Sequence, residues 1–336
     1  MFKEDLQYIS KTLYQVAEDL DQKRILITGG TGFFGINLLN TFKYMIEEEK
    51  YHFTVDVIAR NPERLKKSNK ELYHFKNFNF ISHDIINPLE IDCNYDFIIH
   101  AATSASKEIN DNHPDIMVKT IINGTINILD FCKNYKTKLL YISSGAVYGN
   151  NASLYQNLAI NHYNAIDPLS INYSYHLSKI CAENLCFSYS KNFGLEIKIA
   201  RCFAFVGPYL PLDSHFAIGN FINSVINNEK IIINTKGGST RSFLYSSDLI
   251  IWLLKILFFG KNLKPYNVGS PEKITIAELA SKVANFASIP IEIKGLPEKE
   301  SFYVPNVDET MNELNIDNFI NLDKAIQKTI EWYESQ

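Results

Sequence analysis

A glycine-rich turn near the amino terminus limits what this chain can fold into more than any other feature. Residues 28–35 (TGGTGFFG) follow the run at 24–27 and precede the apolar residues 36–39. A strand, a tight turn and a helix in this order bring backbone amides up to a dinucleotide pyrophosphate, and the dipole at the helix start favours an anion. Glycine permits that close approach because it has no Cβ and tolerates positive φ. The sequence therefore predicts a strand, turn and helix that bind a dinucleotide.

A second cluster predicts acid–base chemistry at the end of another strand. Tyr175 and Lys179 are four residues apart and share one face of a predicted helix. A neighbouring ammonium and an oxidised nicotinamide ring both favour the phenolate, so the pKa of Tyr175 is expected to fall below its usual value of about 10. Ser144 follows the apolar strand predicted at 138–143, whose carboxyl end opens into the ligand crevice. We expect Tyr175 to exchange a proton with a carbinol, and Ser144 to bridge the substrate oxygen to Tyr175.

Further segments extend this pattern in a fixed order: 83–85 (HDI), 100–102 (HAA), 123–125 (NGT), 143–149 (SSGAVYG), 206–208 (VGP), 241–243 (RSF) and 266–269 (YNVG). Together with residues 28–35 and 175–179 (YHLSK), they resemble the extended short-chain dehydrogenase/reductases over residues 24 to about 310. That group includes NAD(P)-dependent nucleotide-sugar epimerases, dehydratases and reductases. The resemblance implies an α/β fold with a Rossmann-like, doubly wound parallel sheet and a smaller C-terminal α/β substrate domain. It also implies a homodimer.

The resemblance assigns residues to the cofactor as well. Asp84 is expected to contact the adenine, and the backbone of Ala101 and Ala102 to line the dinucleotide. The complete set expected at the cofactor is Gly29, Thr31, Gly32, Phe33, Phe34, Gly35, Arg60, Asp84, Ile85, Ala101, Ala102, Thr103, Asn123, Ser143, Tyr175 and Lys179. The expected catalytic residues are Tyr175, Lys179 and Ser144, and no metal site is predicted.

Arg60 bears on the choice between NADP and NAD. An Asp or Glu at the end of the second strand normally binds the ribose hydroxyls of NAD and repels a 2′-phosphate, but this chain has Arg60 there. A guanidinium can bind a phosphate through paired hydrogen bonds. NADP is therefore favoured, and the alternative is NAD with Arg60 stacked on the adenine.

Apolar strands alternate with amphipathic helices, which independently predicts a parallel sheet covered on both faces. The expected strands are 24–28, 54–59, 78–82, 97–100, 139–143 and 197–205. Prolines and glycines break the pattern after Gly207. The expected parts are an N-terminal amphipathic helix within 1–22, a dinucleotide-binding domain at 23–205 plus 241–262, and a substrate-binding domain at 206–240 plus 263–336. We expect the N-terminal helix to pack on its own domain; a dimer contact or a membrane-surface role is the alternative.

The residues after Ser144 limit which reactions are expected. Relatives that dehydrate sugars carry two acids there, and decarboxylases use a similar glutamate, whereas this chain has Gly145 and Ala146. Neither residue transfers a proton, so both reactions are disfavoured. A C4 epimerase or a 4-keto reductase acting on a nucleotide-linked sugar, in surface-polysaccharide precursor metabolism, needs only Ser144, Tyr175 and Lys179. Arg60 favours the reductase, because a reductase consumes NADPH.

Candidate substrate residues join Ser144. By the resemblance Arg241 binds a phosphate of a nucleotide-diphosphate sugar, and His215 and Asn220 are candidates for the diphosphate or the sugar. A surface histidine and an arginine in an ordinary ion pair are the alternative. Relatives commonly carry Asn where this chain has Ala204, so local contacts are expected to differ. Three other functions stay open: a 4,6-dehydratase with an unusual acid pair, an NADPH-dependent reductase of a small carbonyl compound, and a protein that senses NADP without turnover.

Composition limits the expected classes of binding partner and the expected cellular compartment. The 336 residues carry a net charge of −4 and no basic stretch interleaved with aromatics, which disfavours nucleic-acid binding. Five cysteines without regular spacing fit a reducing compartment. The chain starts without a secretory signal pattern, and the apolar stretch at 249–259, interrupted by Lys255, indicates a buried helix because it is too short to span a bilayer. We therefore expect a cytoplasmic protein that makes no membrane contact.

Overall fold

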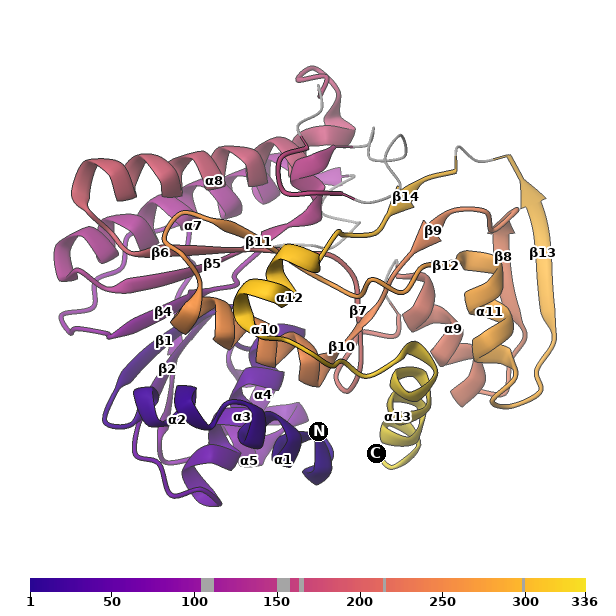
Figure 1. The fold of residues 1–336 in the computed structure, drawn as a ribbon, viewed down its shortest axis with the longest axis horizontal. Coiled ribbons are helices and arrows are strands. Elements are labelled where there is room, and N and C mark those ends of the chain that lie inside the picture. Colours follow the sequence, from indigo (N-terminus) through magenta and orange to yellow (C-terminus); the bar gives the residue numbers. More distant parts are fainter. Residues whose placement is uncertain (104–111, 150–157, 163–165, 214–215, 298–299) are drawn as a thin grey trace.

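A seven-stranded parallel sheet forms the centre of the molecule in the computed structural model (Figure 1). The structure describes residues 1–103, 112–149, 158–162, 166–213, 216–297 and 300–336. The strand order is β11-β6-β5-β4-β1-β2-β3, and every pair of neighbours is parallel. The strands are β1 (Arg24–Thr28), β2 (Thr54–Ala59), β3 (Phe78–Ser82), β4 (Phe97–His100), β5 (Lys138–Ser144), β6 (Ile197–Cys202) and β11 (Pro265–Val268). The order reverses between β1 and β4, so a ligand crevice is expected beyond their carboxyl ends, and the doubly wound prediction is confirmed.

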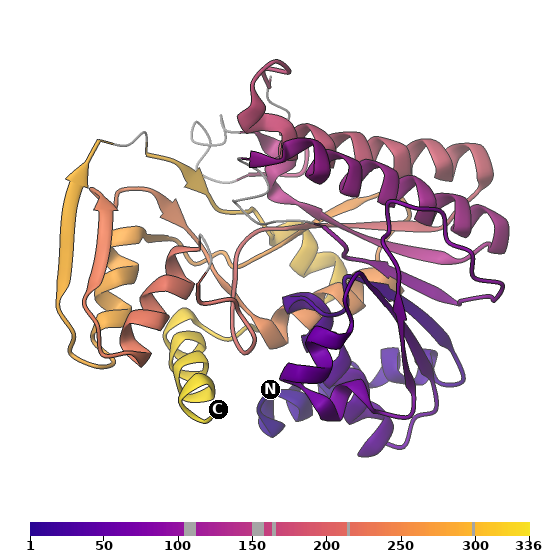
Figure 2. The same ribbon diagram turned by 180° about the vertical axis from the view of Figure 1, so that it is seen from behind.

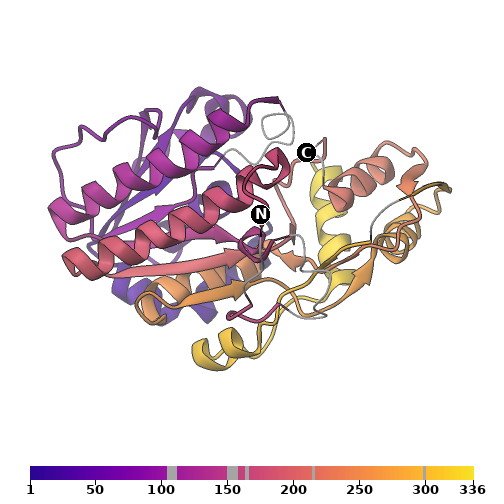
Figure 3. The same cartoon turned by 90° about the horizontal axis from the view of Figure 1, so that it is seen from above.

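Helices cover both faces of this sheet, and each face has its own apolar core. The long helices α7 (Pro114–Tyr135) and α8 (Ser174–Phe193) lie side by side on one face (Figure 3). The other face is covered by α1 (Lys3–Thr12), α2 (Tyr14–Leu20), α3 (Phe33–Glu47) and α10 (Ser246–Phe259). Short helices α4 (Glu63–Ser68) and α5 (Lys70–Tyr73) connect β2 to β3, and α12 (Asp308–Leu314) packs against α10 and β11.

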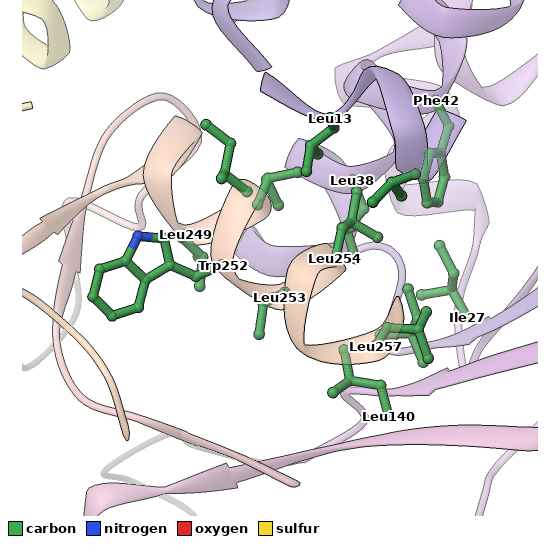
Figure 4. Close-up of a cluster of buried hydrophobic side chains, with 14 of the residues drawn as sticks. Leu13, Ile27, Leu38, Phe42, Leu140, Leu249, Trp252, Leu253, Leu254 and Leu257 are labelled. Atoms are coloured by element: carbon green, nitrogen blue, oxygen red, sulfur yellow. The ribbon is translucent and has the colours of Figure 1, made fainter. Parts of the chain in front are cut away.

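Helix α10 shows why the long apolar stretch is a core helix. Trp252, Leu253 and Leu254 have no exposed surface, and burial of each such side chain contributes about 1.5–3 kcal/mol. Figure 4 shows α10 between Leu38 of α3 and Leu140 of β5. Among the described residues, no helix has the length and apolarity needed to cross a membrane.

The N-terminal segment folds as two helices, not one, because the backbone leaves helical geometry at Leu13 (φ −109°, ψ 22°). Both helices contribute to the core on the α10 side of the sheet, and Ile9, Val16 and Leu20 are buried in it. The segment therefore packs on its own domain.

A smaller part of the molecule surrounds a separate apolar core (Figures 1 and 2). Its helices are α9 (Ala217–Ile226), α11 (Ile276–Ala284) and α13 (Leu322–Glu334). Strands β8 (Ile231–Thr235) and β13 (Ile291–Leu296) pair in parallel, and β9 (Thr240–Arg241) lies between β12 (Ile274–Thr275) and β14 (Phe302–Tyr303). Strand β7 (Phe205–Val206) pairs with β10 (Leu244–Tyr245) where the chain passes between the two parts.

Strand β11 falls within the segment 263–336, which the sequence pattern places in the smaller part. In the structure β11 pairs with β6 at the edge of the large sheet. Tyr266 and Val268 explain this placement, because both are fully buried in the core that α10 covers. The division into two domains at the predicted boundaries stays a proposal.

Candidate active site

The glycine-rich turn is shaped by close backbone contacts. Gly29 has φ +74°, and a Cβ on it would lie 2.9 Å from the carbonyl carbon of Ala101. A Cβ on Gly35 would lie 2.2 Å from the Cα of Gly30, so helix α3 starts directly against the turn. Gly32 is the N-cap of α3 and offers no side-chain oxygen, which leaves the first helical amides available to an anion.

Two buried polar residues hold the turn against the end of β4. The Thr28 hydroxyl oxygen accepts a hydrogen bond from the Ala102 amide at 3.1 Å and lies 2.7 Å from His100 Nδ1. Burial, with a smaller effect from the Lys179 charge, lowers the pKa of His100 to about 3, so the imidazole is neutral. The sequence pattern gave no role to Thr28 or His100, although both lie in quoted segments.

Other predicted cofactor residues gather around the same crevice, at the ends of β2, β3 and β4. The Asp84 carboxylate accepts from the Ile86 amide at 3.2 Å, and Ile85 lies 3.0 Å from where a Cβ of Gly124 would be. The Arg60 side chain is exposed one residue beyond β2. Thr31, Phe33, Phe34 and Thr103 are half-buried, and Gly32 and Asn123 are exposed.

These residues fit a dinucleotide. A Cβ on Gly29 would meet the Ala101 backbone, so glycine lets the turn approach the end of β4, and the Thr103 hydroxyl is buried with no hydrogen-bond partner in the described part of the chain. The Thr103 hydroxyl thus offers bonding capacity to a ligand at the carboxyl ends of β1 and β4.

The predicted catalytic residues meet where β5 ends and α8 begins. Lys179 is buried, and its ammonium donates to the Ile142 carbonyl oxygen at 2.9 Å. Burial lowers the pKa of Lys179 to about 8. Tyr175 lies one turn earlier on α8, and Ser144 is near enough to influence the pKa of its phenol. The structure thus brings Ser144, Tyr175 and Lys179 together.

One expectation about Tyr175 is wrong for the free protein. Burial raises the pKa of this phenol above its usual value, and the nearby Ser144 hydroxyl only opposes the shift. The physical reason is that desolvation disfavours the phenolate while the Lys179 ammonium is directed to the Ile142 carbonyl.

A second phenol, which the sequence pattern missed, lies at the end of β5. Tyr303 comes from the two-residue strand β14, and its phenol lies beside Gly145, the residue after Ser144. The ring packs on Phe203 with centroids 4.7 Å apart. A Cβ on Gly145 would lie 2.6 Å from Tyr303 Oη, so the glycine at that position is the signal that could have indicated a close neighbour.

A buried ion pair supports the end of β5. Arg201 binds Glu183 through Nε to Oε1 at 3.0 Å and Nη2 to Oε2 at 2.7 Å. Ser143, predicted to contact the cofactor, donates its hydroxyl to Glu183 Oε1 at 2.5 Å. Arg201 also donates to the Tyr148 hydroxyl at 2.9 Å. The Ser143 hydroxyl therefore serves this network.

The candidate substrate residues lie in different surroundings. Arg241 in β9 is the register partner of Tyr303, and its guanidinium donates to the Ser301 carbonyl oxygen at 3.1 Å and to the Ser301 hydroxyl at 2.8 Å. Asn220 is exposed on α9, and His215 lies outside the described residues. Over the described ranges, no cluster of three or more His, Cys, Asp or Glu could hold a metal ion.

Similar proteins share the sequence pattern and the fold. UDP-glucuronic acid decarboxylase 3 from Arabidopsis thaliana is 34% identical over 81% of this chain and 76% of its own length. UDP-glucuronic acid decarboxylase 1 from Danio rerio is 30% identical over 94% of this chain and 74% of its own length.

Solved structures agree in fold. UDP-glucuronic acid 4-epimerase from Bacillus cereus, in complex with UDP-glucuronic acid and NAD, has a TM-score of 0.77 at 24% identity, covering 93% of this chain and 99% of that one. UDP-N-acetylglucosamine 4-epimerase from Methanobrevibacter ruminantium has a TM-score of 0.79 at 21% identity, covering 94% and 99%. Residues 25–269 match the NAD dependent epimerase/dehydratase family. These matches confirm the resemblance drawn from the sequence, and the chain belongs to the NAD-dependent epimerase/dehydratase family of nucleotide-sugar enzymes.

Proposed function

We propose that this protein is an NAD(P)-dependent enzyme that transfers hydride at C4 of a nucleotide-linked sugar, as a C4 epimerase or a 4-keto reductase. The observation that carries the proposal is the meeting of Ser144, Tyr175 and Lys179 at the end of β5, beside a Gly145 that leaves no room for an acid.

The chemistry follows from the positions of these groups. A bound nicotinamide supplies the acceptor or donor of hydride. On oxidation, the C4 hydroxyl proton passes to Tyr175, and on reduction Tyr175 returns a proton to the C4 oxygen. Ser144 orients that oxygen by a hydrogen bond. Lys179 favours the Tyr175 phenolate through its positive charge once the cofactor excludes water from the site.

Dehydration is disfavoured by the room around Ser144. Elimination of water needs a base that removes the C5 proton and an acid that protonates the leaving C6 hydroxyl, and the side-chain space at Gly145 is taken by Tyr303 and Phe203. Glu183 is a carboxylate close to this region, but it is bound by Arg201 and Ser143. Neither Gly145 nor Ala146 can replace the missing acids.

Decarboxylation of UDP-glucuronic acid is the second candidate, because five relatives named for that reaction are 30–34% identical to this chain. It would start with the same oxidation at C4, after which a carboxylate next to the resulting ketone can leave as CO₂. The proton that then returns to C5 would have to come from a group other than Gly145 or Ala146.

For the cofactor form we propose NADP over NAD. The exposed Arg60 guanidinium at the end of β2 supports this choice, since it can bind a 2′-phosphate through paired hydrogen bonds. The family is NAD-dependent, and an NAD-bound relative shares the fold. Arg60 stacked on the adenine of NAD therefore stays the alternative.

The other parts of the proposal concern the substrate, the assembly and the compartment. Arg241 would bind the diphosphate, as its place beside Tyr303 supports. Exposed apolar side chains on α7 and α8, Ile116, Ile180 and Phe187, support a homodimer through these helices. All five cysteines are free, which supports a reducing, cytoplasmic location.

The first experiment identifies the cofactor and the product. Mass spectrometry of the small molecules released from denatured protein shows whether NAD or NADP is retained, and titration of the emptied protein compares their affinities. Incubation with UDP-glucose or UDP-glucuronic acid, followed by NMR, then reports the configuration at C4. Retained NAD with inversion at C4 would establish an epimerase. Release of CO₂ or formation of a 6-deoxy sugar would overturn the proposal.

A further inference from the structure

Residues 301–306, here called the crossing segment, contact both parts of the molecule. Near the start of this segment, β14 pairs with β9 of the smaller part. At its end, the Asn306 amide donates to the Leu158 carbonyl oxygen at 3.1 Å, and the chain continues to α12, which packs on β11 of the large sheet (Figure 1). The segment also carries Tyr303, whose phenol lies beside Gly145 at the end of β5. A shift of the crossing segment would therefore move β9 and Tyr303 relative to the end of β5.

Asn267 on β11 holds the far end of the crossing segment. Its fully buried side chain donates from Nδ2 to the carbonyl oxygens of Asn306 at 2.9 Å and Leu158 at 2.8 Å. Its Oδ1 accepts from the Tyr148 hydroxyl at 2.7 Å. Both partners of the nitrogen are carbonyl oxygens, which only accept, so the orientation of the amide follows from its neighbours. Both amide hydrogens and the amide oxygen are thus engaged.

Two glycines let the crossing segment come close to the large sheet. A Cβ on Gly269, two residues after Asn267, would lie 2.8 Å from Pro305 Cγ. A Cβ on Gly145 would lie 2.6 Å from Tyr303 Oη. Only a residue without a Cβ permits such approaches, so a larger side chain at either place would press the segment away. The segment is therefore packed directly against the ends of both β5 and β11.

Arg241 holds the near end of the crossing segment. Its guanidinium donates to the Ser301 carbonyl oxygen at 3.1 Å and to the Ser301 hydroxyl at 2.8 Å. Arg241 is also the residue proposed to bind the diphosphate. Its place relative to Ser144 therefore depends on a segment whose other end is held by Asn267.

We propose that Asn267 is a positioning residue for the substrate: by holding the crossing segment against β11, it sets the place of Arg241 relative to Ser144. This inference rests on the proposed function, in which the reaction takes place beside Ser144 and the diphosphate binds Arg241. It separates the substrate from the cofactor, because β6, β5 and β4 lie between β11 and the strand β1 that leads into the glycine-rich turn. Loss of the Asn267 side chain should therefore affect substrate binding and spare the cofactor.

The direct test is Asn267→Ala, which removes all three hydrogen bonds of this side chain. Hydrogen exchange followed by mass spectrometry, with NAD or NADPH added, measures the protection of the amides in peptides that cover the crossing segment. We expect their exchange to become about tenfold faster, since an ordinary hydrogen bond corresponds to about tenfold in an equilibrium constant. Exchange at the wild-type rate would overturn the proposal, whatever the substrate proves to be.

Kinetics give a second readout that a purely structural role would not produce. With an accepted nucleotide sugar, KM of Asn267→Ala should rise about tenfold, because the anion contact is misplaced. The value of kcat and the Kd of the cofactor should stay within about threefold of wild type, which is the pattern of a lost binding interaction. A lower kcat with unchanged KM, or an equal weakening of the cofactor, would contradict positioning through the crossing segment.

Asn262→Ala is the matched control, because Asn262 also joins neighbouring segments, at the opposite end of β6 and β11. Its side chain accepts from the Ile197 amide at 2.7 Å and donates to the Ser190 hydroxyl at 3.3 Å. We expect this change to lower stability and to leave both KM and the exchange of the crossing segment at their wild-type values. The same rise in KM in this variant would show that any weakening of this sheet edge has the effect, and would overturn the specific role of Asn267.

Gly269→Ala offers an independent variant if Asn267→Ala folds poorly. The added methyl group would meet Pro305 Cγ at 2.8 Å and press the crossing segment away from β11. The same rise in KM and the same faster exchange are expected. If wild type turns over no nucleotide sugar while the exchange of the crossing segment responds as expected, the proposed substrate is wrong and the anchoring role of Asn267 stands.

Discussion

Two buried polar clusters in this molecule differ in how they use their hydrogen bonds. The first is the active-site cluster of Ser144, Tyr175 and Lys179. The second, here called the junction cluster, joins α1, α10 and α13 through Asp5, Tyr245, Asp248 and Lys328, all of them buried. Both contain groups with strongly shifted pKa values, including Lys179 at about 8 and Asp248 at about 7.

The charged and polar groups of the junction cluster bond to one another and to a nearby backbone amide. Asp5 accepts from the Tyr245 hydroxyl at 2.9 Å and pairs with Lys328 at 2.9 Å, and Asp248 accepts from the Ile320 amide at 2.8 Å. In the active-site cluster, Lys179 has three donors, of which the described chain engages one, on the Ile142 carbonyl. The two clusters thus differ in unused hydrogen-bonding capacity, and not in burial or in shifted pKa values, which supports the proposal that the first of them binds a ligand.

The largest expected difference between the clusters is in turnover. Tyr175→Phe keeps the ring and removes the titrating hydroxyl, so kcat should fall by about 10²- to 10⁴-fold, the usual contribution of acid–base catalysis. Steady-state kinetics with the accepted nucleotide sugar measures it. Tyr245→Phe, the equivalent change in the junction cluster, should alter stability and leave kcat within about threefold. If kcat of Tyr175→Phe stayed within tenfold of wild type, the two clusters would not differ in their contribution to turnover.

Arg241→Ala tests whether the Arg241 guanidinium binds the diphosphate of the substrate. Loss of a charge-assisted contact should lower kcat/KM by about 10- to 100-fold, since such a bond contributes about 1.5–3 kcal/mol. The comparison is kinetic, with Lys294→Ala on β13 as the control, because Lys294 is an exposed cation in the same part of the molecule. Undiminished activity with a nucleotide sugar would show that the diphosphate binds elsewhere.

Arg60→Ala tests the exposed charge at the end of β2. We expect the Kd for NADPH to rise about tenfold while the Kd for NADH stays within about twofold, because only NADPH carries the 2′-phosphate. Fluorescence titration of the emptied protein measures both constants. Equal weakening of the two cofactors would instead favour stacking of Arg60 on the adenine.

The junction cluster should respond to pH through stability alone. Burial raises the pKa of Asp248 to about 7 in the folded protein, against about 3.9 in an unfolded chain. The folded state thus binds this proton more tightly, so the contribution of Asp248 to stability is full below about pH 4 and is lost as the pH rises through 7. Asp248→Asn removes the ionisation and keeps an oxygen for the Ile320 amide.

Thermal unfolding at two pH values checks whether the contribution of Asp248 to stability falls as the pH rises. Asp248→Asn should unfold a few degrees above wild type at pH 8 and show a smaller gain at pH 5, given that about 1 kcal/mol shifts Tm by roughly 2–4 °C in a domain of 150–250 residues. The same gain at both pH values would mean that ionisation of Asp248 does not limit stability.

The sequence predicted those parts of the fold and site that depend on local spacing. The spacing of the glycines at 29–35 is typical of a tight turn, in which Gly35 packs on Gly30, and a four-residue interval places Tyr175 and Lys179 on one helix face. Tyr303 could not be found in this way. Its strand has two residues, and its contact with Gly145 joins segments that are distant in the chain.

Competition between physical effects explains the other differences. An adjacent ammonium lowers the pKa of a phenol, but burial opposes it at Tyr175, and the sequence does not show how deeply a side chain is buried. Strand β11 follows the break in the strand–helix pattern, yet its apolar residues are buried at the edge of the large sheet. Local pattern predicted the elements well and their long-range partners less well.

The pairing of β9 with β14 fixes the separation between the backbones of Tyr303 and Arg241. Tyr303 and Arg241 face each other across paired strands, and neighbouring strands are held about 4.8 Å apart by their backbone hydrogen bonds. Under the proposed function, in which the reaction takes place beside Ser144 and an anionic group binds Arg241, main-chain geometry limits the distance between the reacting carbon and that group. Substrates in which the two are much closer together or farther apart would then bind less well.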